Sequence, residues 1–422
     1  MSRLQAFRGN YIDTPEYGIL EKFSGYLIAE DGVIRDRRTE LPDGWNGEMT
    51  DFGDAVVIPS FCDVHLHAGQ YENIGIGYDH QLLEWLEKYT YPTEKKFYDL
   101  EYSKSIYKRL LRELWEVGTL HFISMCTAST DSTALFMDLI AESGLEAYVG
   151  KRNTDYQITT TDNEDTETSY LGTLQLLQEK GEQYENVRYI LSPSFVPGCT
   201  EEMLGRLGRL AEKTMTPVQS HLDETLSEIQ LVKDRFPEIS SYAAVYEKYH
   251  IIGKSRTIMA HCNYIGDDEI RLLKKHHVMV AHCPCSNLDL GSGIMPLRKL
   301  KDAGLEIGLG SDISGGHTLN LATVMKTAVE VSKLRYLANP QESPATIPEA
   351  LYLATKGGGA FWGNTGSFEK GYSFDALVIC DEDTGRLNLQ ERLEKFIYAG
   401  DYRQIKARYL KGVRLDRPCF SE

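Results

Sequence analysis

Residues 55–67 of the chain, AVVIPSFCDVHLH, combine the pattern of a buried strand with two histidines at its end. The run of β-branched and aromatic residues favours a strand. Because side chains alternate along a strand, His65 and His67 share one face, and Asp63 lies on that face one pleat earlier. Two imidazoles on one face can chelate a single ion, so the stretch predicts a strand that ends at one edge of a metal site.

Seven more strand-like runs follow along the chain, at residues 119–127, 146–151, 187–195, 217–224, 256–262, 278–284 and 306–312. Between them lie longer segments with apolar residues every three or four positions, such as SKSIYKRLLRELWEVG at 103–118. Repeated strand–helix units predict an α/β fold, and eight of them fit a closed (β/α)8 TIM barrel. The carboxyl ends of all eight strands then open on one face, where barrel enzymes carry their active sites.

The two ends of the chain have a different pattern. Residues 1–54 and 365–422 contain strand-like pieces such as FSGYLIAEDGVIRD and FDALVICDE, separated by Gly and Asp turns. We expect both termini to build one small β-sandwich domain, with residues 55–364 forming the barrel. The segment 68–100 is an insertion after the first barrel strand, where we expect it to shape or cover a substrate pocket. The acidic segment 161–168 is expected to be a solvated loop.

Composition narrows the classes of partner. The 422 residues carry 62 acidic and 45 basic side chains, a formal charge of −17, which argues against nucleic acids and anionic membranes as partners. The first residues lack the apolar core of a signal peptide, and no apolar run is long enough to span a bilayer. Eight cysteines without regular spacing suggest reduced thiols, among them Cys283 and Cys285, which we expect to be buried and structural. A soluble, cytoplasmic protein is expected.

Further ionisable residues stand where the other predicted strands end. The fifth strand ends in His221, the sixth in His261, the seventh in His282 and the eighth in Asp312. A histidine or aspartate on a buried strand is costly unless it is paired or coordinated, so this repeated placement calls for one explanation. A shared divalent cation provides it. Imidazoles with one carboxylate suit zinc or iron and leave a position open for water, as a catalytic site requires.

Glu224 follows His221 by three residues and lies just beyond the predicted strand end. There it can accept a proton from water activated by the ion and deliver that proton to a substrate, which is the role of a general acid/base. The alternative is that Glu224 only caps the helix that begins in DETLSEI. The ligand candidates around it favour catalysis.

Six segments, HLHAGQY, LLEWLEKYTYP, QSHLDE, AHCNYI, AHCPCSNLDLGSG and GLGSDISGG, together resemble the amidohydrolase superfamily. Within that superfamily LLEWLEKYTYP is similar to the guanine deaminases. The resemblance spans most of the chain and keeps the order of the motifs. It implies a cytoplasmic homodimer that hydrolyses a small-molecule purine, converting guanine to xanthine and ammonia after water attacks the ring carbon that bears the amine.

Site residues carry over from the resemblance one by one. It implies one Zn²⁺ per chain, with Fe²⁺ as the alternative, and His261 as the residue that polarises the bound water or the intermediate. Glu224 and Asp312 would shuttle protons, with Glu224 protonating the ring nitrogen beside the attacked carbon. Gln70 would contact the purine. The implied metal ligands are His65, His67, His221 and Asp312.

The chain departs from the family pattern after the fourth strand. There it reads Pro193-Ser194-Phe195, where the family has Pro-Arg-Phe and the arginine contacts the purine. Phe195 can still pack on the ring, whereas Ser194 cannot replace a planar guanidinium with its several donors. A related amino-heterocycle, such as a pterin, an oxidised guanine or another aminopurine, is therefore an alternative substrate.

Two other classes of protein are alternatives, a two-metal amidohydrolase and a non-catalytic barrel. An amidohydrolase that cleaves a cyclic amide usually holds two metals, bridged by a carboxylated lysine or a glutamate. Here Lys151 ends the third predicted strand and the fourth ends without a lysine, which favours a single metal. A non-catalytic barrel would have lost metal ligands, whereas every ligand position in this chain is filled.

Overall fold

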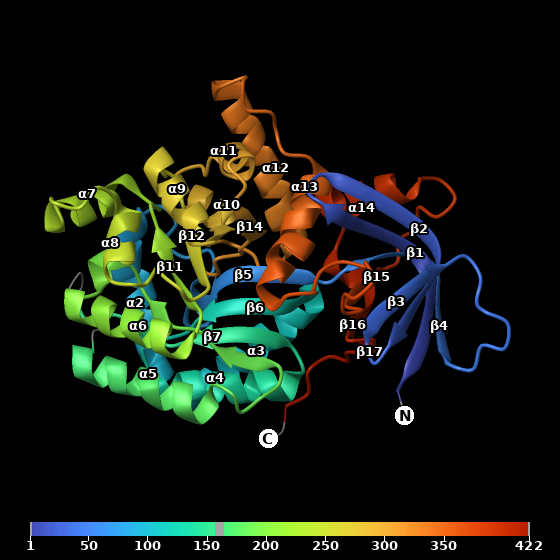
Figure 1. Cartoon of the computed structure of the whole chain (residues 1–422), viewed down its shortest axis with the longest axis horizontal. Helices are drawn as coiled ribbons and strands as arrows, with labels where there is room; N and C mark the ends of the chain where they lie inside the picture. Colours follow the sequence, from blue (N-terminus) through green and yellow to red (C-terminus); the bar gives the residue numbers. More distant parts are fainter. Residues whose placement is uncertain (1, 157–163, 421–422) are drawn as a thin grey trace.

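The computed structural model describes residues 2–156 and 164–420 of the chain. Its centre consists of two four-stranded parallel sheets (Figure 1). The first has the order β5-β6-β7-β9 and the second the order β11-β12-β13-β14. The eight predicted strands are therefore confirmed, with these bounds: β5 (Phe61–His67), β6 (Thr119–Met125), β7 (Glu146–Gly150), β9 (Val187–Tyr189), β11 (Val218–Leu222), β12 (Thr257–His261), β13 (Met279–His282) and β14 (Glu306–Leu309).

The two sheets meet at two seams. At one seam Leu191 and Val218 form an isolated parallel bridge. At the other, the backbone N–H of Asp312 donates to the carbonyl of His65 at 2.8 Å, and that of His67 donates to the carbonyl of Ile313 at 2.7 Å. Ladder pairing is interrupted at both seams, so the strands form a mixed α/β arrangement in which two parallel sheets adjoin, rather than one unbroken ring of pairing.

Side chains from both sheets pack into one interior cluster, which fills the space that the strands surround: Val64, Ile123, Tyr148, Ile190, Ile258, Ala260, Met279, Ala281, Cys283 and Phe361. A larger apolar layer lies between the strands and the outer helices. The outer helices are α3 (Leu100–Val117), α4 (Thr130–Ser143), α5 (Thr166–Lys180), α6 (Glu201–Thr214), α7 (Leu226–Arg235), α8 (Tyr242–Lys248), α9 (Asp267–Lys275), α10 (Pro284–Asp289), α11 (Leu297–Asp302), α12 (Leu321–Ala338) and α13 (Ile347–Tyr352).

Helix α3 shows why these segments fold as they do. Asp99 caps it by accepting hydrogen bonds from the backbone N–H groups of Glu101 and Tyr102. The helix ends at Gly118, whose φ of 84° lies in the left-handed region that glycine tolerates best. Its buried residues recur at helical spacing and face the strands, as the sequence pattern predicts: Ile106, Tyr107, Leu110, Leu111, Leu114 and Val117.

The terminal segments combine as predicted, but their strands form one seven-stranded sheet rather than two facing sheets. Strand β4 runs through Pro59 and pairs with β1 and β15, so residues 55–59 belong to this sheet and the first barrel strand begins only at Phe61. The strands are β1 (Leu4–Glu16), β2 (Ile19–Glu30), β3 (Val33–Arg38), β4 (Glu48–Pro59), β15 (Ala376–Ile379), β16 (Ile405–Leu410) and β17 (Val413–Arg414), and helix α14 (Leu389–Ala399) packs beside them.

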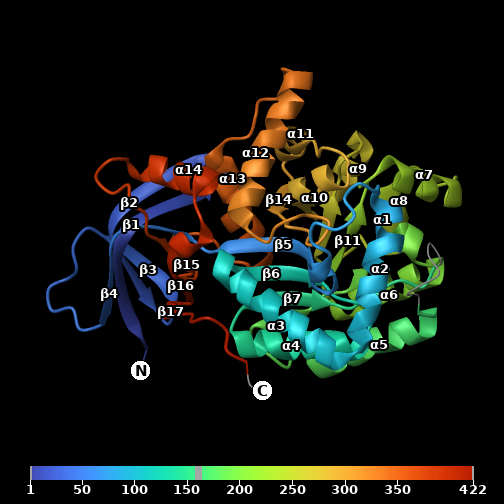
Figure 2. The same ribbon diagram turned by 180° about the vertical axis from the view of Figure 1, so that it is seen from behind.

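The insertion after β5 forms short helices, α1 (Leu82–Trp85) and α2 (Tyr91–Glu94). Seen from behind, they lie at the end of the parallel strands that is remote from the terminal sheet (Figure 2). Two very short strands, β8 (Arg152–Asn153) and β10 (Ser192–Pro193), pair beside them. Of the predicted acidic loop, residues 161–163 lie outside the described part of the chain, and Asp165 caps α5.

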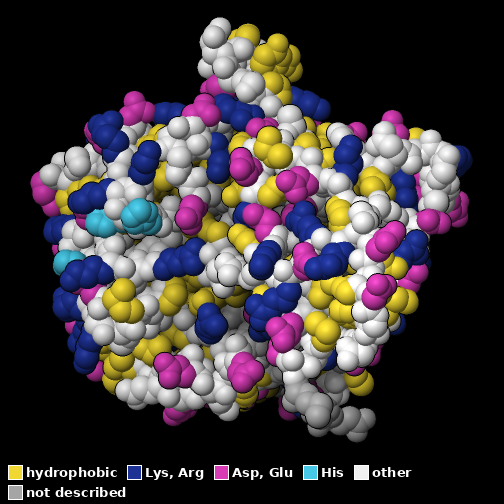
Figure 3. Space-filling view, turned by 45° about the vertical axis from the view of Figure 1, so that its right-hand side comes forward, with side chains coloured by type: hydrophobic (Ala, Val, Ile, Leu, Met, Phe, Trp, Pro, Cys, Tyr) yellow, Lys and Arg dark blue, Asp and Glu magenta, His cyan; other side chains and the backbone are white. Residues whose placement is uncertain are grey.

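On the face shown in Figure 3, lysines and arginines lie interspersed with acidic side chains. Within residues 2–156 and 164–420, no helix has the combined length and apolar character needed to cross a membrane. All eight cysteines are free, and Cys283 and Cys285 are buried as predicted.

Candidate active site

Four predicted ligands meet where the strands end. His65 and His67 come from β5, His221 from β11, and Asp312 follows β14. The Nε2 atoms of His65 and His67 lie 3.3 and 3.2 Å from Oδ1 of Asp312. Nε2 of His221 lies 3.2 Å from Nε2 of His67. The strand alternation therefore placed both histidines of β5 correctly, and distant parts of the chain complete the group.

These separations fit a metal site. Ligand atoms held about 2.0–2.2 Å from one ion in tetrahedral geometry lie about 3.3–3.6 Å apart, close to the three separations above. His65, His221 and Asp312 also form, together with His261, a group whose possible ligand atoms all lie within 4.8 Å of one another. The backbone carbonyl of Ser194 can only accept, so Nδ1 of His221, 2.6 Å away, carries the proton and leaves Nε2 as a lone-pair donor. Nε2 of His65 is buried, and apart from Oδ1 of Asp312 it has no polar partner among the described residues. The donor set suits a divalent cation of the zinc type.

Electrostatics favour the ligand forms of these side chains. Burial is the largest cause that lowers the pKa of His65, to about 4, and it lowers the pKa of His221 well below its usual value. Burial would raise the pKa of Asp312, but hydrogen bonds from His65 and His67 outweigh it and hold that pKa well below the usual range. Neutral imidazoles and an ionised carboxylate are the states that bind a metal.

His261 stands beside this group in a fixed orientation. Oδ1 of Asn287 accepts from Nδ2 of Asn263 at 3.1 Å and lies 2.9 Å from Nδ1 of His261. Since that oxygen only accepts, Nδ1 of His261 carries the proton and Nε2 faces the site. Nε2 lies 3.8 Å from Oδ2 of Asp312 and 3.5 Å from Oε2 of Glu224. His261 therefore touches the two carboxylates expected to move protons.

The geometry also decides between the two roles expected for Glu224, which are helix capping and general acid/base catalysis. Helix α7 is capped by Thr225, whose hydroxyl accepts from the N–H of Glu228 in a capping box, so Glu224 is not the cap. Instead Oε1 of Glu224 accepts from the hydroxyl of Ser292 at 2.8 Å. Burial, and then the charge of Asp312, raise the pKa of Glu224 to about 8. A carboxyl group that keeps its proton near neutral pH can act as a general acid.

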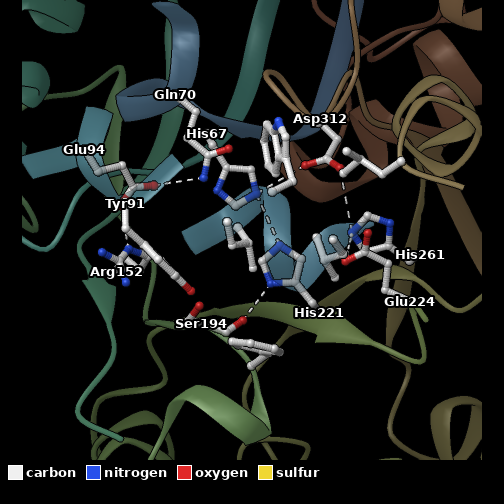
Figure 4. Close-up of a pocket in the computed structure, with 16 residues that line it drawn as sticks. His67, Gln70, Tyr91, Glu94, Arg152, Ser194, His221, Glu224, His261 and Asp312 are labelled. Carbon is white, nitrogen blue, oxygen red and sulfur yellow. Dashed lines mark hydrogen bonds and ion pairs between the residues drawn. The ribbon is translucent and has the colours of Figure 1, made fainter. Parts of the chain in front are cut away.

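His67, His221, His261, Glu224 and Asp312 face one pocket (Figure 4), and His65 lies buried against Asp312. The predicted substrate contacts Gln70, Ser194 and Phe195 line it. Besides Gln70, the insertion supplies five lining side chains, as expected from its position: Leu82, Trp85, Leu86, Tyr91 and Glu94. Most of these belong to the segment LLEWLEKYTYP that carries the resemblance.

Two charged lining residues were missed by the sequence interpretation, Glu94 and Arg152. Glu94 falls three residues after Tyr91, at the edge of the segment that was singled out, so its neighbourhood was a usable signal. Arg152 follows Lys151 in GKRNTD, where nothing in the local pattern distinguishes it from a surface residue. Only the folded chain places it in the pocket.

Lys151, considered as a bridge between two metals, is bound elsewhere. Its amino group donates to the carboxylate of Glu164 and to the hydroxyl of Ser169 at 3.2 Å. The side chain of Asp63 is also occupied, because its Oδ1 accepts from the backbone N–H groups of Ser311 and His65 at 3.0 and 3.2 Å. Neither residue joins the cluster of possible metal ligands found among the described residues.

Known proteins resemble the chain over its whole length. The model of the amidohydrolase family matches residues 56–415. Guanine deaminase of Dictyostelium discoideum is 34% identical over 98% of both chains, and that of Escherichia coli K12 is 30% identical over 97% of both. A crystal structure of guanine deaminase from C. acetobutylicum with bound guanine in the active site has a TM-score of 0.95 and 40% identity, covering 98% of this chain and 100% of that one. The chain therefore belongs to the amidohydrolase family and, within it, to the guanine deaminases.

Proposed function

We propose that this protein catalyses the hydrolytic deamination of guanine to xanthine and ammonia. The observation that carries the proposal is the convergence, at one site, of a metal-type ligand set with the buried carboxyl group of Glu224. The guanine deaminases that resemble the chain, including one with guanine bound, support the choice of substrate.

The metal we propose is one zinc ion per chain, held by His65, His67, His221 and Asp312. When bound, it supplies the Lewis-acid chemistry that makes water a nucleophile at neutral pH. Fe²⁺ is the alternative, because imidazole and carboxylate ligands suit both ions. The engagement of Lys151 by Glu164 speaks for one metal and against a two-metal amidohydrolase, and metal content per chain by elemental analysis distinguishes them.

The residues of the chain then handle protons. Asp312 accepts one proton from the attacking water. Glu224 delivers its proton to the ring nitrogen beside the attacked carbon. Asp312 then passes its proton to the departing amine, which leaves as ammonia, and Glu224 takes up the proton of the added hydroxyl as it becomes the carbonyl of xanthine. His261, between Glu224 and the distal oxygen of Asp312, holds and polarises the oxygen that adds to the ring. One water enters and one ammonia leaves for each xanthine formed.

Two residues are proposed to position the ring, and a third orients a proposed metal ligand. Gln70 offers amide groups to the polar edge of the purine, Phe195 packs on its face, and the carbonyl of Ser194 orients His221. A pterin, an oxidised guanine or another aminopurine is the alternative substrate. A deamination screen across these compounds ranks them against guanine.

The proposal also covers the closure of the barrel, the domain boundaries, the oligomeric state and the location of the protein. We infer that the two parallel sheets close into one (β/α)8 barrel, since their side chains share one interior cluster and backbone hydrogen bonds cross both seams. We propose residues 60–364 as the catalytic domain and residues 1–59 with 365–422 as the terminal domain, since β4 stays in the terminal sheet through Pro59. A homodimer and a cytoplasmic location also remain proposals, the first supported by the family resemblance and the second by the free cysteines.

Replacing Glu224 with glutamine tests the proposal. Glu224→Gln keeps the shape of the side chain but removes the proton that the ring nitrogen needs, so we expect kcat for xanthine formation to fall by about 10²–10⁴-fold with one metal ion still bound. Xanthine is followed by absorbance, ammonia by a coupled assay and metal by elemental analysis. Glu238→Gln, the same change at an exposed position, is the control. Retention of full activity by Glu224→Gln would refute the assignment.

A further inference from the structure

Arg152 is the one lysine or arginine among the described residues that line the pocket. It lies on β8, and its side chain is only 2% exposed. A buried guanidinium is costly unless it is held by partners or serves a ligand. Its position in the wall of the candidate active site therefore calls for a functional account.

The guanidinium is held in a defined plane. Nε donates to Oε2 of Glu94 at 2.8 Å, and one terminal nitrogen donates to the hydroxyl of Thr154 at 2.8 Å. The ring of Tyr91 lies 5.2 Å from the guanidinium carbon, within the range of a cation–π contact. Fixing the plane in advance reduces the ordering cost of binding a flat ligand.

Glu94 connects Arg152 to a residue already assigned to the substrate. Its second oxygen, Oε1, accepts from the side-chain amide of Gln70 at 2.8 Å. Gln70, Glu94 and Arg152 thus form one polar row, which we call the arginine end of the pocket. Figure 4 shows this row on the side of the pocket opposite His261 and Glu224. A ring whose reacting carbon faces Glu224 directs its far edge toward the arginine end.

The neighbouring strand carries Ser194. Strands β8 and β10 pair in parallel, with Ser192 opposite Arg152 and Pro193 opposite Asn153, and the N–H of Ser194 donates to the carbonyl of Asn153 at 3.0 Å. Positions 152 and 194 therefore reach the same wall of the pocket from adjacent strands, and both line it. The guanidinium that the chain lacks at position 194 is present one strand away.

We propose that Arg152 determines specificity by donating hydrogen bonds to the carbonyl oxygen and the imidazole-ring nitrogen on the far edge of the purine. This inference rests on the proposed function and names the residue that selects its substrate. Guanine presents two acceptors, O6 and N7, on that edge, and a planar guanidinium matches such a pair in a way that serine or lysine does not. A 2-aminopurine lacking the carbonyl offers the same reacting carbon without this match.

The test compares kcat/KM for guanine and for 2-aminopurine. In Arg152→Met we expect kcat/KM for guanine to fall about ten- to hundredfold, while the value for 2-aminopurine changes by less than about threefold. Arg152→Lys keeps a positive charge opposite Glu94 but loses the planar guanidinium, so it should show the same loss of discrimination between the two purines. This second variant keeps the test valid if Arg152→Met misfolds. Arg271→Met, at an exposed arginine of α9, is the control.

A relocation variant sharpens the test. Exchanging the two residues, Arg152→Ser with Ser194→Arg, moves the guanidinium to the adjacent strand and should restore at least part of the preference for guanine. An equal loss for both purines in the Arg152 variants, or an unchanged ratio, would overturn the role of Arg152. Absence of ammonia release from either purine by the wild-type protein would instead overturn the proposed function.

Discussion

The two ends of the pocket are built in different ways. At the metal end, formed by His65, His67, His221, Asp312, His261 and Glu224, every side chain comes from the end of a parallel strand or the residues just after it. At the arginine end, formed by Gln70, Glu94 and Arg152, the side chains come from an insertion and from a two-residue strand. In the proposals above, the first end serves the reaction and the second end selects the substrate. The proposed chemistry is then tied to the regular scaffold and the proposed selectivity to the segments added to it.

The largest expected effect is a difference in metal content between a variant at the metal end and a variant at the arginine end. His221→Ala removes a proposed ligand, so we expect the metal content to fall from one ion per chain toward zero and kcat/KM to fall by about 10³-fold or more. Arg152→Met should keep the metal while losing selectivity. Elemental analysis and xanthine formation, measured on the same samples, check both statements. Equal metal loss in the two variants would show that the ends are not separate.

An intermediate effect is expected from the support of His261. Asn287→Ala removes the acceptor that fixes the proton on Nδ1, so we expect kcat to fall about 10- to 100-fold with the metal still bound. Asn287→Asp, which keeps an acceptor oxygen, should retain more activity than the alanine variant. If the metal were lost in proportion to activity, Asn287 would support the ligands rather than His261.

The smallest effect concerns a buried acid behind the metal end. Burial, and then the charge of Glu224, raise the pKa of Glu228 from 4.5 to about 7. At pH values between these two pKa values, the unfolded chain releases a proton that the folded chain keeps. The free energy of unfolding therefore decreases as the pH rises through this window. In the wild type this lowers the free energy of unfolding by roughly 3 kcal/mol across the window. Glu228→Gln should abolish that decrease.

Denaturant midpoints at pH 5 and pH 7.5 measure this change for the wild type and for Glu228→Gln. Glutamine can still accept the backbone N–H groups of Glu224 and Thr225 through its oxygen, so the loop should keep its shape. The exposed variant Glu238→Gln serves again as the control. Identical pH dependence in the wild type and Glu228→Gln would contradict a raised pKa for Glu228.

The metal end could be predicted from the sequence because its signals are periodic. Strand alternation placed His65 and His67 on one face, and the recurrence of strand–helix units placed His221 and Asp312 at the same edge. The predicted sandwich and the start of the first barrel strand at residue 55 were wrong, since β4 continues into the terminal sheet through Pro59. Apolar runs alone do not tell which of two adjoining sheets a strand segment joins.

The sequence by itself determined the number and order of the parallel strands, the type of metal site and the class of reaction. The first two follow from local periodicity and from the chemistry of residue types, whereas the class of reaction follows from the resemblance of six motifs to the amidohydrolase superfamily. Only the tertiary structure decided that Glu224 leaves the cap of α7 to Thr225, and that Arg152 enters the pocket beside Ser194. Both depend on contacts between segments far apart along the chain, Glu224 with Ser292 and Arg152 with Glu94, and no local pattern encodes such contacts.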